Sequence, residues 1–129
     1  MGEAARVFHS MTTTAWPLEL RFSKARAELL IRFDDGAEAA IPYELLRVES
    51  PSAETKGHGN ERPPPPARKR NVGVLAADPV GRYALRIRFD DGHDTGLYTW
   101  PYLAELAEQK TARMTAYLAR LQKLGLSRE

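Results

Sequence analysis

Apolar and polar residues alternate along two separate parts of the chain, as they do in half-buried strands. In the first part the alternation runs through residues 18–22 and, after a break, through 29–33. In the second part, residues 71–78 are a candidate strand and 79–81 a turn. The next strand is expected to place Tyr83, Leu85, Ile87 and Phe89 on one face and Arg82, Ala84, Arg86 and Arg88 on the other.

The six residues IRFDDG occur twice, at 31–36 and at 87–92. Asp-Gly is typical of tight hairpin turns with positive φ angles, so each copy predicts a strand and its turn, with returning strands at 37–41 and 93–98. The similarity continues to a Pro-Tyr pair after each returning strand. We therefore interpret the acidic turns mainly as a repeated folding device.

Two helices are expected. A short helical turn covers 42–47, because Pro is favourable in the first turn of a helix. A long amphipathic helix covers 102–124, with Gly125 as its cap. At 1.5 Å per residue this helix is ~33 Å long. Its distal half, with Leu118 and Leu121, is expected either to pack on a partner or to lie on its own sheet.

These elements predict an α+β fold: a largely antiparallel sheet of two related hairpin units, plus the long C-terminal amphipathic helix. The expected organisation is a flexible tail at 1–15 and a single domain at 16–126. Residues 49–70 are polar and contain four consecutive prolines, so we expect a flexible loop there.

Composition narrows the functional classes. The net charge of +2 does not demand nucleic-acid binding, and the absence of cysteine removes disulfides, thiolate metal sites and thiol nucleophiles. No stretch has the ~18 apolar residues of a membrane span, and no signal peptide is evident. The sequence therefore predicts a cytoplasmic protein that does not associate with membranes.

His93 is the most interesting single residue for chemistry, because histidine titrates near neutral pH and often binds metals. A structural hydrogen bond is favoured over a metal site, since no cysteine accompanies it. A small-molecule or enzyme site with His93 as general base is kept as an alternative. No phosphate-binding glycine loop, nucleophile elbow or metalloprotease motif is present, so we expect no catalysis.

Basic residues in the polar loop raise a second alternative. Arg62, Arg68, Lys69 and Arg70 are candidate phosphate contacts of a nucleic-acid-binding accessory protein, together with the strand arginines. Nearby glutamates favour a solvated segment instead. Nucleic acid is therefore a possible partner that is not favoured.

Several motifs together resemble the gamma-butyrobetaine hydroxylase-like N-terminal domain family over residues 17–106. The most specific are Leu46-Arg47 leading into SPSAE at 50–54, and the segment Asp91-Gly92-His93-x-x-Gly96-x-Tyr98. In the carnitine-pathway dioxygenases of that family, the domain precedes a catalytic barrel. It also looks like a segment appended to Mrp-type ATPases of iron-sulfur cluster assembly, and like small stand-alone bacterial proteins.

The resemblance also implies where a structural zinc would be bound, by three cysteines and a histidine. Those positions correspond here to Ser50, Ser52, Thr55 and His93. Neutral hydroxyls cannot replace thiolates, so we predict no zinc and no other cofactor. Because the barrel is absent as well, hydroxylase activity is not expected.

What the resemblance implies about function is docking rather than reaction. We expect a non-catalytic accessory or protein-interaction domain with an unknown protein partner, a homodimer through the helix, and a link to iron-sulfur or cofactor metabolism. The interaction residues we predict are Arg47, His93, Tyr98, Trp100, Leu118 and Leu121.

Overall fold

The computed structural model describes residues 16–51 and 64–129; the expected tail at 1–15 and residues 52–63 of the expected loop lie outside these ranges. The first unit consists of β1 (Pro17–Ser23), β2 (Glu28–Phe33), β3 (Glu38–Pro42) and the short helix α2 (Tyr43–Val48). Its strands form an antiparallel sheet in the order β1-β2-β3. The alternating pattern of the sequence therefore predicts these strands correctly.

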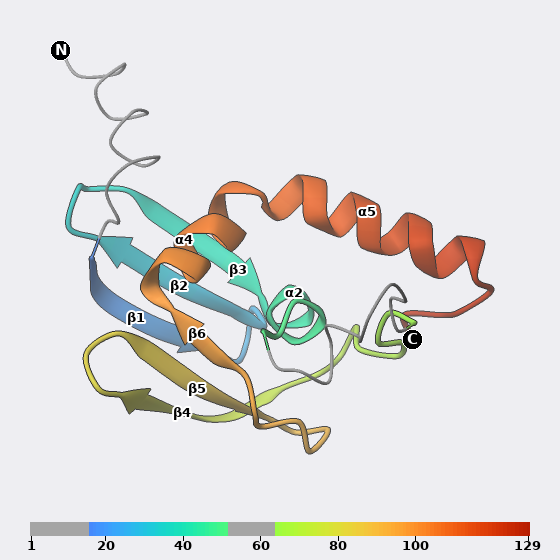
Figure 1. Cartoon of the computed structure of the whole chain (residues 1–129), viewed down its shortest axis with the longest axis horizontal. Coiled ribbons are helices and arrows are strands. Elements are labelled where there is room, and N and C mark those ends of the chain that lie inside the picture. The colour runs from blue at the N-terminus through green and yellow to red at the C-terminus, as the bar shows by residue number, and fades with distance from the viewer. Residues whose placement is uncertain (1–15, 52–63) are drawn as a thin grey trace, which may run out of the picture.

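The second unit repeats this plan. It consists of β4 (Val74–Val80), β5 (Ala84–Phe89), β6 (Leu97–Thr99), α4 (Trp100–Glu108) and α5 (Lys110–Lys123). Its strands form a second antiparallel sheet in the order β4-β5-β6. The predicted α+β class is confirmed, with two three-stranded sheets and helices at the C-terminal end (Figure 1).

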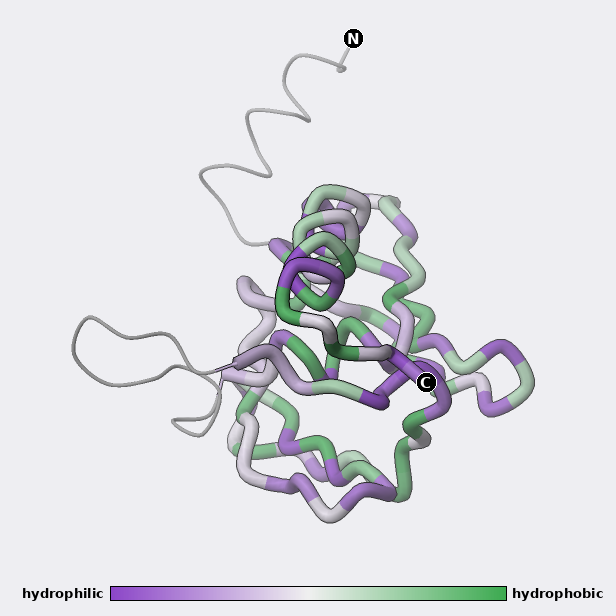
Figure 2. The backbone as a smooth tube through the Cα atoms, turned by 90° about the vertical axis from the view of Figure 1, so that its right-hand side faces the viewer, coloured by the Kyte–Doolittle hydropathy of each residue, from purple (hydrophilic) through white to green (hydrophobic). Residues whose placement is uncertain are grey.

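The core lies between the inner faces of the two sheets and beneath the helices. Ile31 and Phe33 of β2 belong to one buried cluster with Ile87 and Phe89 of β5, and Leu103 of α4 joins them. Figure 2 shows hydrophobic and hydrophilic residues alternating along the strands, as half-buried strands require. Each such aliphatic or aromatic side chain contributes roughly 1.5–3 kcal/mol on burial, so this cluster holds the two units together.

The two Asp-Gly turns have the same backbone geometry. The N–H of Gly36 donates to the carbonyl of Phe33 (3.1 Å), and the N–H of Gly92 donates to that of Phe89 (3.2 Å). Only the glycines have positive φ, +89° and +94°, so the prediction of positive φ at the preceding aspartates is wrong. Each turn is instead a three-residue loop with glycine in its last position.

The aspartate side chains explain this geometry. Oδ1 of Asp35 accepts a hydrogen bond from the backbone N–H of Ala37 (2.9 Å), and Oδ1 of Asp91 accepts one from His93 (3.0 Å). An aspartate that bonds to the backbone two residues later stabilises the turn from an ordinary φ angle. The interpretation of the repeat as a folding device is thus supported at both turns.

The start of β5 differs from the prediction. Pro79 and Val80 extend β4, so the turn lies later than expected, and Gly81 carries its positive φ of +58°. Tyr83 precedes β5 and is 55% exposed, whereas Ala84 is fully buried between its cross-strand neighbours. Ala84 shares a face with Arg86 and Arg88, as predicted, although it is buried; Tyr83 lies outside the strand.

The expected single C-terminal helix is divided at Gln109 into α4 and α5. The reason is that the apolar stripe serves two surfaces: α4 packs near β3 and β6, whereas α5 packs near α2 (Figure 1). Thr99 caps α4, because its hydroxyl accepts the N–H of Tyr102 (3.2 Å). Gly125 caps α5 at φ +70°.

The segment after α5 fixes one end of the predicted loop. Backbone N–H groups of Arg68 and Arg70 donate to the carbonyls of Ser127 (2.8 Å) and Arg128 (2.9 Å). The guanidinium of Arg128 also binds the carboxylate of Glu44, whose side chain is buried in α2 (2.6 Å). Residues 68–70, at the end of the expected loop, are therefore hydrogen-bonded to the C-terminal segment.

Candidate functional site

A buried hydrogen bond joins the end of α2 to the second Asp-Gly turn. The hydroxyl oxygen of Ser50 lies 2.8 Å from Nε2 of His93, and the two residues are 3% and 7% exposed. Gly96 lies directly against Ser50: a Cβ at this position would be 2.3 Å from the Ser50 oxygen. Glycine is thus required for this close approach.

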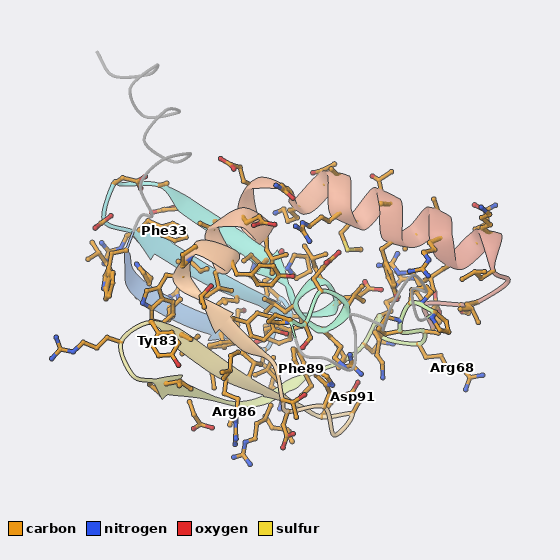
Figure 3. All side chains as sticks on the ribbon, viewed as in Figure 1. Phe33, Arg68, Tyr83, Arg86, Phe89 and Asp91 are labelled. Atoms are coloured by element: carbon orange, nitrogen blue, oxygen red, sulfur yellow. The ribbon has the colours of Figure 1, made fainter. Side chains whose placement is uncertain are left out.

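An ion cluster lies beside this pair. The carboxylate of Asp91 binds Nε of Arg47 (2.7 Å) and Nζ of Lys69 (2.6 Å), and all three side chains are mostly buried. Asp91, labelled in Figure 3, follows β5, whereas Arg47 comes from α2 and Lys69 from the segment before β4. The cluster therefore joins three parts of the chain that are distant in sequence.

The charges of this cluster control the ionisation of Asp91. Burial alone raises the pKa of its carboxyl, but hydrogen bonds from Lys69, from the His93 N–H and from Arg47 outweigh burial and lower the pKa to about 2. Asp91 is therefore ionised throughout the physiological range. Nη1 of Arg47 is buried without a hydrogen-bond partner, so this cation depends strongly on Asp91.

Two tyrosines complete the end of α2. The hydroxyl of Tyr98 donates to the carbonyl of Leu46, and that of Tyr102 to the carbonyl of Glu49, both at 2.5 Å. These acceptors are the carbonyls that a helix leaves unpaired at its C-terminus. Burial raises the pKa of Tyr98, and burial together with Glu49 raises the pKa of Tyr102 to about 12.

Trp16 and Trp100 lie near Tyr83, whose carbonyl accepts the backbone N–H of Trp100 (3.2 Å); we name these three residues the aromatic end. The two tryptophan rings meet edge to face with centroids 6.2 Å apart. Nε1 of Trp100 donates to the carbonyl of Arg82 (2.7 Å), which fixes that ring. Trp16 is 48% exposed, and Tyr83 lies at the opposite end of the molecule from Arg68 (Figure 3).

Sequence reasoning identified Trp100 but missed its two neighbours. In the sequence, Trp16 marks only the start of the domain, and the alternation places Tyr83 on the same face as Leu85. The structure shows that both tryptophans of the chain are at this end.

The predicted phosphate contacts are not brought together. Lys69 binds Asp91, and Arg70 binds the carboxylate of Glu129 (2.6 Å). Arg68 is exposed and points away from the rest of the molecule in Figure 3, and Arg62 lies outside the described residues. Two of the three described cations are therefore neutralised within the chain.

Burial also limits the predicted interaction residues. Tyr98 is fully buried, and Leu121 is 3% exposed, so neither side chain forms part of the surface. Leu118 is half-buried and is the remaining member of the expected helix seam. A homodimer through this helix stays a prediction.

An open groove of about 470 Å³ lies on the outer face of the β1–β3 sheet. Leu30 lines it, together with charged residues of both signs such as Arg21 and Glu38. None of the predicted site residues lines this groove.

A comparison with family models decides what the chain is related to. The model described as gamma-butyrobetaine hydroxylase-like, N-terminal, matches residues 20–104, which is well over half of the chain. The chain belongs to this family. No curated protein matches it.

Solved structures agree with this family assignment. Two solution structures determined by NMR are 44% and 43% identical to the chain, with TM-scores of 0.77 and 0.75. The first alignment covers 90% of this chain and 91% of the other, and the second covers 92% and 88%. A crystal structure of a DUF971-family protein of unknown function from Acidithiobacillus ferrooxidans is 35% identical, with a TM-score of 0.57, covering 70% of this chain and 91% of that one.

The zinc site that the family resemblance implies does not fit the donors of this gamma-butyrobetaine hydroxylase-like chain. Ser50 and His93 lie at that position and are hydrogen-bonded to each other, and a neutral hydroxyl is a poor zinc ligand. Ser52 and Thr55 lie outside the described residues. Within residues 16–51 and 64–129, no three His, Cys, Asp or Glu side chains gather in a metal-binding arrangement.

The same geometry argues against nucleophilic chemistry at the Ser50–His93 pair. The hydroxyl of Ser50 is buried and hydrogen-bonded to His93. The nearby carboxylate of Asp91 accepts the backbone N–H of His93 and binds two cations. These contacts join separate segments of the fold.

In the described part of the chain, no helix is long and apolar enough to cross a membrane.

Proposed function

We propose that this protein is a non-catalytic interaction domain that binds a partner protein through the aromatic end. The observation that carries the proposal is the edge-to-face contact between Trp16, which is 48% exposed, and Trp100, which is partly buried against the core. Large aromatic side chains are enriched among the residues that dominate binding energy at protein interfaces. An aromatic surface of this kind costs solvation free energy in the isolated protein, and a partner recovers it.

The aromatic end is held in place before any partner binds. The N–H of Trp16 donates to Oδ1 of Asp34 (3.1 Å), and the N–H of Asp34 donates to the carbonyl of Trp16 (2.8 Å). The N–H of Trp100 donates to the carbonyl of Tyr83 (3.2 Å). Because the backbone is already ordered, binding costs less conformational entropy than it would at a mobile loop.

The polar cluster around His93 supports a non-catalytic role. Its hydroxyl, carboxylate and tyrosine groups are occupied by bonds within the chain. The nucleic-acid alternative is weakened because Lys69 and Arg70 pair with Asp91 and Glu129. The link to iron-sulfur or cofactor metabolism rests on the family resemblance, and the identity of the partner decides it.

The proposal is tested by affinity capture of the tagged full chain from its own cell lysate, treated with nuclease, followed by measured binding of the purified partner. Trp16→Ala and Tyr83→Ala are expected to weaken binding by about tenfold or more each, since hot-spot residues contribute upward of about 2 kcal/mol. Leu124→Ala is the matched control, because Leu124 is equally exposed but lies beyond α5. Equal losses in all three variants, or a nuclease-sensitive complex, contradict the proposal.

A further inference from the structure

The two copies of IRFDDG allow one Asp-Gly turn to serve as a reference for the other. Asp35 and Asp91 occupy the same place in the two copies, and Oδ1 of each accepts the backbone N–H two residues later. The residues before them also correspond. The N–H of Asp34 donates to the carbonyl of Trp16 (2.8 Å), and the N–H of Asp90 donates to the carbonyl at the same place in the second copy (2.9 Å). The two turns can therefore be compared position by position.

The turns differ at the second oxygen of this carboxylate. Oδ2 of Asp91 binds Nε of Arg47 (2.7 Å) and Nζ of Lys69 (2.6 Å). Within residues 16–51 and 64–129, no cation forms an ion pair with Asp35 or with the adjacent Asp34. The first turn thus has the carboxylate that binds two cations in the second turn, but this part of the chain supplies no cation to it.

The first turn adjoins the aromatic end. The backbone N–H of Trp16 donates to Oδ1 of Asp34 (3.1 Å), so the exposed tryptophan and this carboxylate are direct neighbours. Asp34 is exposed and Asp35 is half-buried. Figure 3 shows Phe33, which precedes the turn, at the same end of the molecule as Tyr83. A partner that covers Trp16 therefore also meets the carboxylates of the first turn.

The charges of this region favour a partner with a positive charge. Arg82, which precedes Tyr83, is exposed and has no ion-pair partner among the described residues. Its single guanidinium stands against the two carboxylates of the first turn, so the region has an excess of negative charge. One cation placed beside Trp16 balances the region, whereas the two carboxylates repel the phosphates of a nucleic acid.

We propose that the partner of the aromatic end presents an arginine, whose guanidinium binds Oδ2 of Asp35 and lies beside the ring of Trp16. This inference rests on the proposed function and names the chemistry of the segment that is bound. Arginine is favoured over lysine because its planar guanidinium both pairs with a carboxylate and stacks on a tryptophan ring. The chain itself provides the precedent, since Nε of Arg47 binds the equivalent oxygen of Asp91.

The test is an NMR titration of the full chain, up to millimolar concentration, with a short blocked peptide of serine and leucine that contains one arginine. The matched peptide has citrulline at that position, which has nearly the shape of arginine but no charge. We expect amide shifts at Trp16, Asp34 and Asp35. At low salt the arginine peptide is expected to bind on the order of fivefold more tightly than the citrulline peptide, the upper range for an exposed ion pair. High salt should reduce this difference.

Two variants locate the charge. Asp35→Asn is expected to remove the difference, so that the arginine and citrulline peptides bind with equal affinity. Asp90→Asn is the matched control, because Asp90 is an exposed aspartate of the second turn. It should leave the affinity for the arginine peptide within about twofold of that of the original protein. The amide spectrum away from the first turn confirms that each variant is folded.

Several results overturn the inference. They are equal affinities of the original protein for the two peptides, no shift at the first turn at millimolar peptide, equal losses in Asp35→Asn and Asp90→Asn, or tighter binding of a peptide with glutamate in place of arginine. The captured partner separates this inference from the proposed function. A loss of its binding in Trp16→Ala without a loss in Asp35→Asn overturns the inference alone, and full binding in Trp16→Ala overturns both.

Discussion

The hydroxyl oxygen of Ser50 and Nε2 of His93 are 2.8 Å apart in the interior, and they join the end of α2 to the second Asp-Gly turn. The first turn has Ala37 at the position of His93. The two turns share one backbone geometry. Of the two, the second turn is the one that is hydrogen-bonded to the end of α2. One copy of a repeated turn has thereby become a structural junction between the units.

Ser50→Ala removes this hydrogen bond. We expect it to lower the free energy of unfolding by about 1–2 kcal/mol, the usual cost of deleting one partner of a buried hydrogen bond. Ser23→Ala is the control, since the Ser23 hydroxyl accepts a hydrogen bond in an exposed turn. Chemical denaturation measures both, and an equal cost for the two variants contradicts the junction.

Gly96→Ala tests the close approach of the Gly96 backbone to the Ser50 side chain. The added Cβ would lie 2.3 Å from the Ser50 oxygen, and rotating that hydroxyl away breaks its bond to His93. We expect a loss of about 2 kcal/mol or more, as for other overpacked interiors. In a double-mutant cycle the cost should fall in the Ser50→Ala background, because the clashing oxygen is absent. Additive effects rule out this steric explanation.

Asp91→Asn removes the negative charge of the ion cluster but keeps an acceptor for the hydrogen bond of the turn. Asn keeps an oxygen for the His93 N–H but leaves Arg47 and Lys69 without their counter-charge, so we expect a loss of about 2 kcal/mol. Asp35→Asn makes the same change in the first turn, where the carboxylate bonds the Ala37 N–H. That control should stay within about 0.5 kcal/mol. Thermal denaturation of the two variants provides the comparison.

The lowered pKa of Asp91 also predicts the acid stability. A carboxyl whose pKa is lower in the folded state stabilises the fold above its usual value of 3.8, and this contribution is lost as pH falls toward about 2. Because part of the group contacts solvent, we expect about 1–2 kcal/mol from this residue. The free energy of unfolding of Asp91→Asn should therefore depend less on pH in that window. Parallel curves for the variant and the original protein contradict the assignment.

The raised pKa values of Tyr102 and Tyr117 predict how the stability of the fold changes at alkaline pH. Burial, with a contribution from Glu49, raises the pKa of Tyr102 to about 12, and burial, with one from Glu44, raises that of Tyr117 to about 12. A raised pKa means that the folded state retains the proton, so stability present below pH 10 is lost as pH rises toward 12. Tyrosinate absorbance should rise together with the loss of circular dichroism. Ionisation of these groups well before unfolding is the contrary result.

The fold was predictable where the pattern was local. The period-two alternation in β2 and β5 identified both strands, and Asp-Gly identified both turns. The division of the C-terminal helix at Gln109 was not predictable, because a single apolar stripe does not reveal that two different surfaces cover it. Tertiary packing, rather than helix propensity, determines this break.

The site was predictable only in part for a similar reason. The family motif placed Ser50 near His93, and the structure brings them into contact. Lys69 was assigned to phosphate, since a run of basic residues does not reveal that Asp91 of a distant turn binds one of them. The exposed Trp16 was missed because one residue before a strand carries no periodic signal.

The central claim is that the cluster around His93 stabilises the fold and that partner binding depends on the aromatic end. The most direct measurement compares the affinity of the captured partner for Ser50→Ala and for Trp16→Ala, both at a temperature where each variant is folded. The account predicts that Ser50→Ala binds within about twofold of the original protein, whereas Trp16→Ala loses about tenfold or more. Loss of binding in Ser50→Ala with full binding in Trp16→Ala would contradict it.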